Sequence, residues 1–449
     1  MTFKPDKILL KTLLTLAVPI ALQNLIVYST NLMDTLMLGR VGEVQLSAAA
    51  MANQLFFVMM VLGFGIGSGS NVLISQYWGK GDRKAAKQVM SVALRTGLLV
   101  SLVFMALAVL APAQVMRIFT PDPLAISEGA KYLRIMGCSM PFTMMASVMI
   151  MTLRPLGSVG ISLYSSSVSL VVNVFLNWVL IFGKLGAPAL GVTGAAIATL
   201  IARVIELLIV AVYLFRYEEK LTLRFDDLKT QDKAMVKDFV ANCVPIMFNE
   251  LLWSLGMSAV TAIIGQMSTG FMAANGIYAS VNQIMMVAIF GLSNSGAVLV
   301  GKAIGSGQRE KVGPIAAMLL SGALLWGLLM GTMLFFGRGF LLSFYTLTPE
   351  THRLAMGVMA VGSVVIIFQS LANASLIGVL RGGGDARFVL LVDTIFLWLV
   401  SIPLGALAGF YFKLPPPVVY CVLKADELLK VLFSITRILR GRWVRDVTR

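Results

Sequence analysis

The sequence predicts an all-α membrane protein with twelve transmembrane helices in two pseudo-symmetric six-helix lobes. Of the 449 residues, 58% are apolar and only 13% are charged, against about 25% charged in a soluble domain. A helix needs about 20 apolar residues to cross a bilayer, so this composition supplies roughly a dozen crossings. The second half of the chain also repeats motifs of the first. A soluble fold is thereby excluded.

Apolar runs between charged or Pro/Gly-rich breaks predict the individual spans. The first six lie near residues 13–38, 46–75, 89–112, 132–153, 160–182 and 191–215, and the second six near 239–264, 274–300, 314–336, 353–380, 388–410 and 416–436. With the N-terminus inside, the cytoplasmic segments hold 24 Lys and Arg residues and the opposite side holds 8. This bias predicts a multi-pass protein of the bacterial inner (plasma) membrane with both termini cytoplasmic.

Four features recur in the same order in the two halves. Gly79-Lys80-Gly81-Asp82-Arg83 is matched by Gly305-Ser306-Gly307-Gln308-Arg309, Pro19 by Pro245, Leu153-Arg154 by Leu380-Arg381, and Arg203 with Glu206 by Lys424 with Glu427. The offsets are 226, 226, 227 and 221 residues, which indicates a duplication with small insertions. We therefore expect an N-lobe at 1–215, a charged cytoplasmic linker at 216–238, a C-lobe at 239–436 and a basic tail at 437–449.

Several function classes are excluded by the residues that are scarce. The chain has one histidine, His352, and its three cysteines lie singly in apolar stretches, so no zinc cluster, disulfide framework or Ser/His/Asp arrangement can form. The segment 296–302 resembles a phosphate-binding loop, but Ala303 stands where Ser or Thr is required. We expect neither an enzyme nor a cofactor. The charge of +15 belongs to cytoplasmic loops, so we expect no nucleic-acid partner.

Acidic and amide side chains inside the spans are the candidates for function, because Asp at the centre of a membrane helix costs about 2.5 to 3.5 kcal/mol. Asp34 continues a polar stripe formed by Asn24, Tyr28 and Asn31 on the first span. Asn173 and Asn177 lie one turn apart on the fifth span, and Thr199 lies on the sixth. This oxygen-rich set could hold Na⁺ as a metal ion, or a proton on Asp34. The alternative role for each asparagine side chain is a hydrogen bond between helices rather than ion binding.

A second polar focus is expected in the other lobe. Glu250 lies on the seventh span, and Asn275, Tyr278 and Asn282 form a stripe on the eighth. Asp393 lies a turn or two into the eleventh span. Asp385 lies between two arginines in a glycine loop, where we expect it to cap a helix or to form a salt bridge. For Arg203 with Glu206 and Lys424 with Glu427 we favour structural ion pairs. The alternate glycines Gly63, Gly65, Gly67 and Gly69 favour close helix packing over a bend.

Three motifs resemble the multidrug and toxic compound extrusion (MATE) family. They are Asp-Thr-Leu-Met-Leu-Gly-Arg at 34–40, Gly-Lys-Gly-Asp-Arg at 79–83 and Leu-Arg-Gly-Gly-Gly-Asp-Ala-Arg at 380–387. The resemblance implies an antiporter that expels organic, often cationic and lipophilic, compounds or drugs in exchange for Na⁺ or H⁺. It implies a cation site at Asp34, Asn173 and Asn177, acidic positions at Glu250 and Asp385 in the C-lobe, and a hinge at Pro19. Asn177 stands where some relatives carry a second Asp, which leaves this site with less charge.

We expect cargo to contact the polar in-span residues, namely Asn24, Tyr28, Asn31, Glu250, Asn275, Tyr278, Asn282, Asp385 and Asp393.

The alternative function is a flippase for a lipid-linked precursor, which would favour a strongly cationic cavity, whereas the in-span charges here are mixed in sign. A membrane enzyme would need clustered catalytic side chains, and a channel would repeat its acidic ring symmetrically, but the counterpart of Asp34 is near Val260. We expect a monomer in the lipid bilayer.

Overall fold

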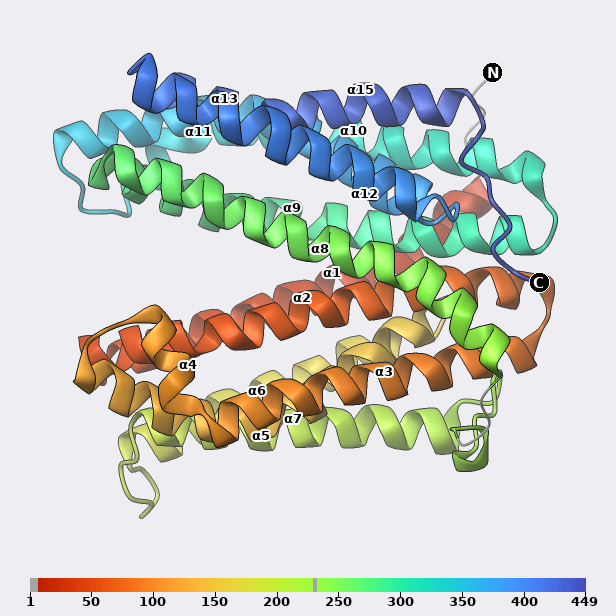
Figure 1. The fold of residues 1–449 in the computed structure, drawn as a ribbon, viewed down its shortest axis with the longest axis horizontal. Coiled ribbons are helices and arrows are strands. Elements are labelled where there is room, and N and C mark those ends of the chain that lie inside the picture. The colour runs from red at the N-terminus through yellow and green to blue at the C-terminus, as the bar shows by residue number, and fades with distance from the viewer. Residues whose placement is uncertain (1–6, 229–231) are drawn as a thin grey trace. The chain divides into compact units, whose positions relative to one another are not determined.

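The computed structural model describes residues 7–228 and 232–449, and every regular element in these residues is a helix (Figure 1). The first half contains α1 (Lys7–Gly39), α2 (Glu43–Lys80), α3 (Arg83–Leu110), α4 (Pro112–Phe119), α5 (Pro123–Leu153), α6 (Gly160–Phe182) and α7 (Val192–Val212). The second half contains α8 (Lys233–Met267), α9 (Thr269–Gly305), α10 (Arg309–Leu342), α11 (Pro349–Asn373), α12 (Ala386–Thr394), α13 (Ile402–Ala406), α14 (Pro416–Leu423) and α15 (Ala425–Leu439).

Shorter helical turns extend or join these elements. Two have 3₁₀ geometry, η1 (Arg154–Leu156) and η3 (Phe225–Leu228), and four are π-helical, η2 (Tyr213–Tyr217), η4 (Ala374–Arg381), η5 (Ile395–Ser401) and η6 (Leu407–Tyr411). The π-helical stretches η5 and η6 alternate with α12 and α13, so residues 386–411 form one continuous rod. The π-helical stretch η4 likewise extends α11 to Arg381.

Eleven of the described helical stretches are long and apolar enough to cross a membrane, and they match the first eleven predicted spans in order. The predicted all-helical membrane fold is thereby confirmed. The twelfth predicted span is divided into α14 and α15, because the backbone at Lys424 (φ −111°, ψ 7°) leaves the helical conformation. The short helix α4 was not predicted; it starts at Pro112, a residue suited to the first helical turn.

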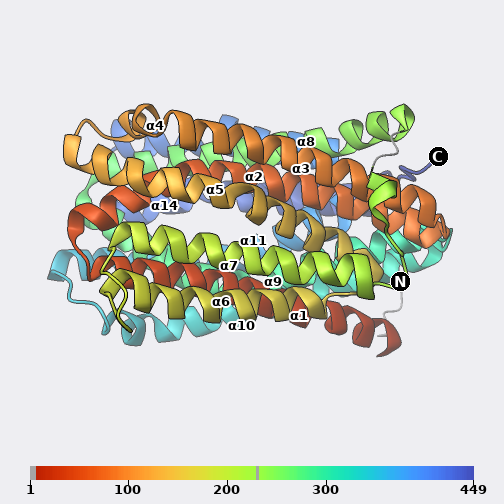
Figure 2. The same ribbon diagram turned by 90° about the horizontal axis from the view of Figure 1, so that it is seen from below.

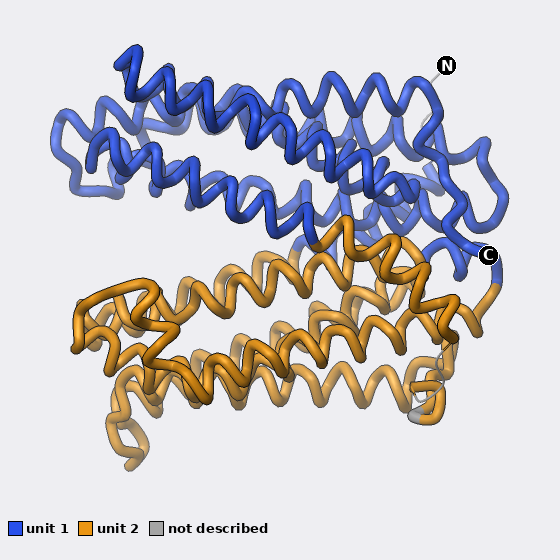
Figure 3. The backbone as a smooth tube through the Cα atoms, viewed as in Figure 1, with its two compact units in different colours: residues 1–21, 75–81, 248–449 blue, residues 22–74, 82–247 orange. Residues whose placement is uncertain are grey.

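The described chain forms two compact units (Figure 3). Unit 1 comprises the chain up to residue 21, residues 75–81 and residues 248–449, and unit 2 comprises residues 22–74 and 82–247. The division falls inside α1, α2 and α8, so these long helices each contribute to both units. In α1 and α8 the division lies two residues after Pro19 and Pro245, respectively.

The helices of unit 2 are packed around α5 and α7. Helix α5 contacts α3 and α7, and α7 contacts α6; Figure 2 shows α6 and α7 side by side. The side chains of α6 that face inward are mostly small or polar, since Ser162, Ser165, Ser166, Ser169, Asn173 and Asn177 are buried. Small residues allow helix backbones to approach closely in a membrane, where no hydrophobic force drives helices together.

The glycines of α2 let its neighbours within unit 2 approach the helix backbone. They are Gly63, Gly65, Gly67 and Gly69. A Cβ atom on Gly63 would lie 2.6 Å from Sδ of Met144 on α5, and one on Gly65 would lie 2.7 Å from Cα of Met247 on α8. Gly67 also faces α5, and Gly69 also faces α8. The alternate glycines therefore allow α5 and α8 to pack closely against α2. This is the close packing expected from the sequence.

In unit 1, α9 packs against α10, α11 and η4, and α11 packs against α10, α14 and α15. At one end of this bundle the ring of Tyr278 on α9 lies edge-on to Tyr420 on α14, with centroids 5.6 Å apart. At the other end, Gly79 and Gly305 allow α2 and α9 to meet backbone to backbone. Gly81 and Gly307, in the two repeated turns, have φ of 82° and 74°, a conformation that glycine adopts without strain.

The chain after α15 is held against the end of α2 and the glycine turn 382–384. The amide N of Arg445 donates to the Gly383 carbonyl at 2.9 Å. The Gln76 side chain accepts from the Val447 amide N at 2.8 Å and donates to the Arg445 carbonyl at 3.1 Å. Trp443 is 3% exposed, so the basic tail is ordered by packing as well as by hydrogen bonds.

The charged linker is also anchored, as far as it lies within the described residues; residues 229–231 lie outside them. Lys87 Nζ on α3 lies 3.1 Å from Asp227 Oδ2 and donates to the Thr222 carbonyl at 2.8 Å. The pKa of Asp227 lies below its ordinary value. Burial by itself would raise this pKa, but the hydrogen bond from the Arg224 amide N–H and the Lys87 ammonium together lower it by more than burial raises it. Asp227 is therefore charged at neutral pH, and this contact persists there.

We predict that Gly65→Ala destabilises the protein, because the added Cβ would overlap the backbone of Met247. Overpacking of this kind costs about 1 to 3 kcal/mol. The matched control is Gly276→Ala in α9, where no atom lies within 4 Å of the added Cβ. Thermal unfolding of the purified protein in detergent should show a lower melting temperature for Gly65→Ala only. Equal melting temperatures for the two variants would contradict the packing role.

Candidate functional site

Asp34 lies near the end of α1, and its carboxylate meets the amides of α6. Nδ2 of Asn177 donates to Asp34 Oδ1 at 2.5 Å and to Asn173 Oδ1 at 3.1 Å. Nδ2 of Asn173 in turn donates to Thr199 Oγ1 on α7 at 3.3 Å. The structure thus brings together, from three helices, all four residues for which a cation-coupling site is expected.

This cluster keeps oxygen atoms available. Asn177 is fully buried, yet its Oδ1 has no hydrogen-bond partner. Within residues 7–228 and 232–449, Asp34 forms no ion pair with a lysine or arginine. Asp34 is half-buried, and a partly desolvated carboxylate without a tethered cation is stabilised when it takes up a proton or a free cation. Carboxylate, amide and hydroxyl oxygens together suit a hard cation such as Na⁺.

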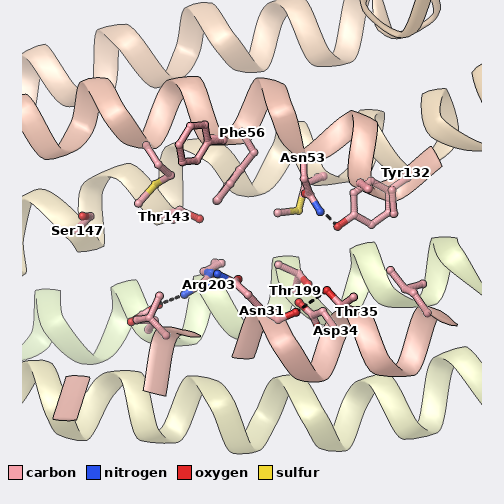
Figure 4. A pocket seen from close by; sticks show the side chains of 18 of the residues that line it. Asn31, Asp34, Thr35, Asn53, Phe56, Tyr132, Thr143, Ser147, Thr199 and Arg203 are labelled. Atoms are coloured by element: carbon pink, nitrogen blue, oxygen red, sulfur yellow. Dashed lines mark hydrogen bonds and ion pairs between the residues drawn. The ribbon is translucent and has the colours of Figure 1, made fainter. Parts of the chain in front are cut away.

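Asp34 also lines a cavity of about 450 Å³ within unit 2. Figure 4 shows Asn31, Asp34, Thr35, Thr199 and Arg203, from α1 and α7, on one side of it, and Asn53, Phe56, Tyr132, Thr143 and Ser147, from α2 and α5, on the other. Its size lies within the range of small-molecule sites, which is about 300 to 1,000 Å³. The cavity therefore can hold an organic molecule next to the carboxylate.

The remainder of the cavity wall is largely apolar and flexible. It includes Phe56, Phe57 and Met60 from α2 and Met136 from α5. Across from Asp34, the Tyr132 hydroxyl donates to Asn53 Oδ1 at 3.4 Å. Met and aromatic side chains adapt to ligands of different shape, and aromatic faces attract organic cations. The wall thus combines one carboxylate with surfaces suited to lipophilic cations.

The positive charge of Arg203 at this cavity is neutralised by its neighbour on α7. Arg203 Nη1 donates to Glu206 Oε2 at 2.7 Å, and the Ser166 hydroxyl donates to Glu206 Oε1 at 3.0 Å. The structural ion pair expected here is confirmed.

The corresponding expectation for Lys424 and Glu427 is wrong: they form no ion pair among the described residues, because Lys424 lies at the break between α14 and α15.

Of the predicted stripe on α1, the cavity includes only the part nearest to Asp34. Asn31 lines it, whereas Asn24 and Tyr28 are not among its described lining residues. Gln23, one position before Asn24, lines it instead and accepts from Arg154 Nη2 at 3.4 Å. Asn53, Tyr132 and Thr143 were missed by the sequence analysis, because single polar residues on α2 and α5 form no stripe that distinguishes them.

Glu250 is paired with an arginine rather than open to a cavity. Arg381 Nη1 lies 2.8 Å from Glu250 Oε1, and the Arg381 side chain is 2% exposed. Arg381 is the repeat counterpart of Arg154, which contacts Gln23 on α1 in the same way that Arg381 contacts α8. These two arginines therefore tie the fourth helix of each repeat to its first.

Asp393 belongs to a separate charged cluster. Lys430 Nζ on α15 lies 2.6 Å from Asp393 Oδ1 and 2.7 Å from Asp426 Oδ2, and Asn249 Nδ2 donates to Asp393 Oδ2 at 3.1 Å. Neither Lys430 nor Asn249 was predicted from the sequence as a site residue. A lysine deep in an apolar helix was the signal that could have found this cluster.

The other predicted residues of the second half do not converge on the cavity near Asp34. The Tyr278 hydroxyl lies 3.3 Å from both Asn282 Oδ1 and the Gly362 carbonyl, so it ties α9 to α11. Asn275, one turn earlier on the same helix, is half-buried. The structure therefore places the stripe of α9 at a helix contact within unit 1.

Asp385 forms the salt bridge expected in the glycine loop, although not with the arginines beside it in the sequence. Its carboxylate lies 2.8 Å from Arg437 Nη2 and 3.2 Å from Arg445 Nη2, and the side chain is 1% exposed. Arg437 Nε donates to the same carboxylate at 2.9 Å. Asp385 thus ties the start of α12 to α15 and the tail within unit 1.

The helix α1 passes through Pro19 without interruption. A proline inside a helix removes one backbone hydrogen bond and weakens the helix locally. The two compact units divide just after this residue, and also just after Pro245 in α8. A hinge at Pro19 stays a prediction.

Comparisons with known proteins agree with this arrangement. The MatE family model matches residues 19–179 and again residues 245–407, which supports the predicted duplication. A probable multidrug resistance protein NorM from Thermotoga maritima is 25% identical over 448 residues, covering 96% of this chain and 93% of the relative. A probable NorM of Agrobacterium fabrum is 27% identical over 417 residues, covering 89% and 87%.

A crystal structure of MATE in the straight conformation has the same fold, with a TM-score of 0.87 and 17% identity over 96% of both chains. The two matches of the family model together span most of the chain. The chain therefore belongs to the MatE family of membrane transporters, the multidrug and toxic compound extrusion proteins.

Proposed function

We propose that this protein is a secondary active antiporter that exports organic compounds, often cationic and lipophilic, in exchange for Na⁺ or H⁺. The observation that carries this proposal is Asp34, a carboxylate without a tethered cation on the wall of a 450 Å³ cavity. The names of the relatives, which are probable multidrug resistance proteins, support this class of cargo. Transport requires no catalytic group or cofactor.

Exchange follows from competition for one negative charge. An organic cation in the cavity and an inorganic ion at Asp34 are attracted by the same carboxylate, and binding of one weakens the attraction for the other. Na⁺ would be held by oxygens of Asp34, Asn173, Asn177 and Thr199, whereas a proton needs only Asp34. Ion entry from outside therefore favours release of the cargo outward.

The proposed cycle is alternating access, with Pro19 as a hinge in α1. One elementary charge that crosses about 100 mV supplies about 2.3 kcal/mol, which corresponds to a concentration ratio of roughly fifty. For cargo without net charge, one coupled ion per cycle therefore suffices to drive uphill export. Exchange for a monovalent organic cation moves no net charge, so the concentration gradient of the coupling ion then supplies the free energy. We place the protein as a monomer in the bacterial inner membrane, with both termini cytoplasmic, on the basis of the basic loops.

A flippase for a lipid-linked precursor is the second candidate, and the charge of the cavity disfavours it. A phosphate group needs cationic side chains, but Arg203 is already paired with Glu206 at 2.7 Å, and Asp34 adds a negative charge. The wall thus has no free cation among its described residues and would repel an anion.

We predict that Asp34→Asn abolishes ion-driven export, because the amide can neither hold a proton nor attract a cation by charge. The assay is export of a fluorescent organic cation from proteoliposomes, with Na⁺ and pH gradients imposed separately. The matched control is Asp227→Asn, which removes a carboxylate of the linker outside the cavity and should export like the parent. Export by Asp34→Asn at the parent rate under a full ion gradient would overturn the proposed function.

A second variant distinguishes the two ions. Asn177→Leu removes both the donor to Asp34 and the unpartnered Oδ1. We expect Na⁺-driven export to fall at least tenfold, since Na⁺ needs these oxygen ligands, and proton-driven export to fall less. Asn242→Leu is the control, because the hydrogen bond of Asn242 among the described residues lies within α8, to the Asp238 carbonyl. An equal loss under both gradients would mean that Asn177 does not act as an ion ligand.

The aromatic wall provides a third prediction. Phe56→Ala should raise the KM for lipophilic cations about 2- to 30-fold, the range that corresponds to a cation–π contact of roughly 0.5 to 2 kcal/mol. The maximal rate should change less, since Asp34 is intact. Phe336→Ala, an exposed aromatic in unit 1, is the control. Initial export rates over a range of cargo concentrations separate KM from maximal rate, and an unchanged KM in Phe56→Ala would place the cargo elsewhere.

A further inference from the structure

The second half of the chain contains a buried group of charges that the proposed function does not use. Lys430 is 2% exposed and Asp426 is 3% exposed. The Lys430 ammonium lies between two carboxylates, 2.6 Å from Asp393 Oδ1 and 2.7 Å from Asp426 Oδ2. One positive charge therefore contacts two negative charges contributed by α12 and α15, and the Glu427 carboxylate of α15 attracts it from a greater distance.

The other oxygen atoms around this ammonium are oriented by neighbouring helices. Asn249 Nδ2 donates to Asp393 Oδ2 at 3.1 Å, and the Ser401 hydroxyl donates to Asp426 Oδ1 at 3.2 Å. Asn249 is 4% exposed, and its Oδ1 has no hydrogen-bond partner. The group thus contains carboxylate oxygens and one unused amide oxygen, a donor set that resembles the one around Asp34.

The electrostatics require a cation in this position. Two buried carboxylates repel each other, and removing the only partner of a buried charge typically costs several kcal/mol. Lys430 supplies the charge that a monovalent ion would supply, and its ammonium is compact and close to two oxygens. An ion of the same charge and similar size meets the same requirement, because carboxylate and amide oxygens are ligands of hard cations.

The first half of the chain carries no lysine or arginine at the position that corresponds to Lys430. The offset of 221 residues that pairs Arg203 with Lys424 places Ile209 opposite Lys430. Asp34 is instead hydrogen-bonded to Asn177 and lies on a cavity. The two repeats therefore treat their buried carboxylates differently: one is open to exchange, and the other carries a cation attached to the chain.

We propose that Lys430 is a built-in cation that occupies a monovalent-cation site formed by Asp393, Asp426 and Asn249. Removal of the lysine side chain converts this cluster into a site for free Na⁺ or ammonium. A consequence that rests on the proposed antiport is that only one cation, the one at Asp34, exchanges in each cycle.

The test measures cation binding without transport. Asp34→Asn serves as the background, so that the first site does not respond. In this background, Lys430→Ala should lower the melting temperature in choline chloride, and ammonium or sodium chloride at equal ionic strength should restore at least half of the loss with a saturable dose dependence. Choline is too large to take the place of the lysine ammonium. The background itself should show no such difference between salts.

Two further variants make the result specific. Lys424→Ala removes a lysine of the same segment that lies 3.8 Å from Met257 Sδ and interacts with Asp426 and Glu427 without a close ion pair to a described carboxylate. It should show no cation-specific response, because no carboxylate loses a directly bound ammonium. Asp393→Asn combined with Lys430→Ala should lose the response, because a principal ligand is gone. If Lys430→Ala does not fold, Lys430→Ala with Asp426→Asn keeps the net charge of the cluster and is titrated in the same way.

A folded Lys430→Ala protein that sodium and ammonium stabilise no better than choline would overturn the proposal, as would the same result for the charge-balanced variant. This outcome is independent of the antiport test. Failure of Asp34→Asn to impair export would leave the cation titration of Lys430 variants unaffected, and a flat titration would leave the role of Asp34 intact.

Discussion

The arrangement of this protein depends on one constraint: a carboxylate inside hydrocarbon must be compensated. Most of the described Asp and Glu residues in the membrane helices have a cationic partner, either on another helix or one turn away on the same helix. Glu250 pairs with Arg381, Glu206 with Arg203, and Asp393 with Lys430. Asp34 differs, since among the described residues it has hydrogen bonds from amides and the more distant charge of Arg203 but no ion pair, and a cavity lies beside it. The pairs hold helices together, whereas Asp34 is the acid without an ion pair that lies on the described cavity, and we propose that it takes part in exchange.

Duplication explains the architecture but not this asymmetry. The repeats share their glycine turns, with Gly81 and Gly307 in the same left-handed conformation, and their anchoring arginines. They differ where charge matters: Asp34 corresponds to the neighbourhood of Val260, a buried core residue, and Lys430 corresponds to Ile209. Backbone geometry is thus retained by turns whose positive φ favours glycine, while single substitutions within the spans give each half its own electrostatics.

The candidate site could be predicted in part. Asp34, Asn173, Asn177 and Thr199 were found because polar residues at helical spacing in an apolar span are costly and therefore conspicuous. Their convergence in the structure agrees with that reasoning. Asn53 and Tyr132 were not found, because a single polar residue on a helix has no periodicity to indicate where it faces. The stripe of α9 had the right spacing, yet Tyr278 faces α11 rather than a cavity.

The sequence by itself determined the fold class, the approximate course of eleven membrane helices, the duplication and the list of costly in-span charges, because hydropathy and spacing are local properties of the chain. Only the tertiary structure decided which charges neutralise one another. Arg381 with Glu250 and Lys430 with Asp393 join residues far apart in the sequence, and the break at Lys424 removes an ion pair that the spacing indicated. Electrostatic compensation depends on distances of a few ångström across helices, and those distances arise only when the helices pack.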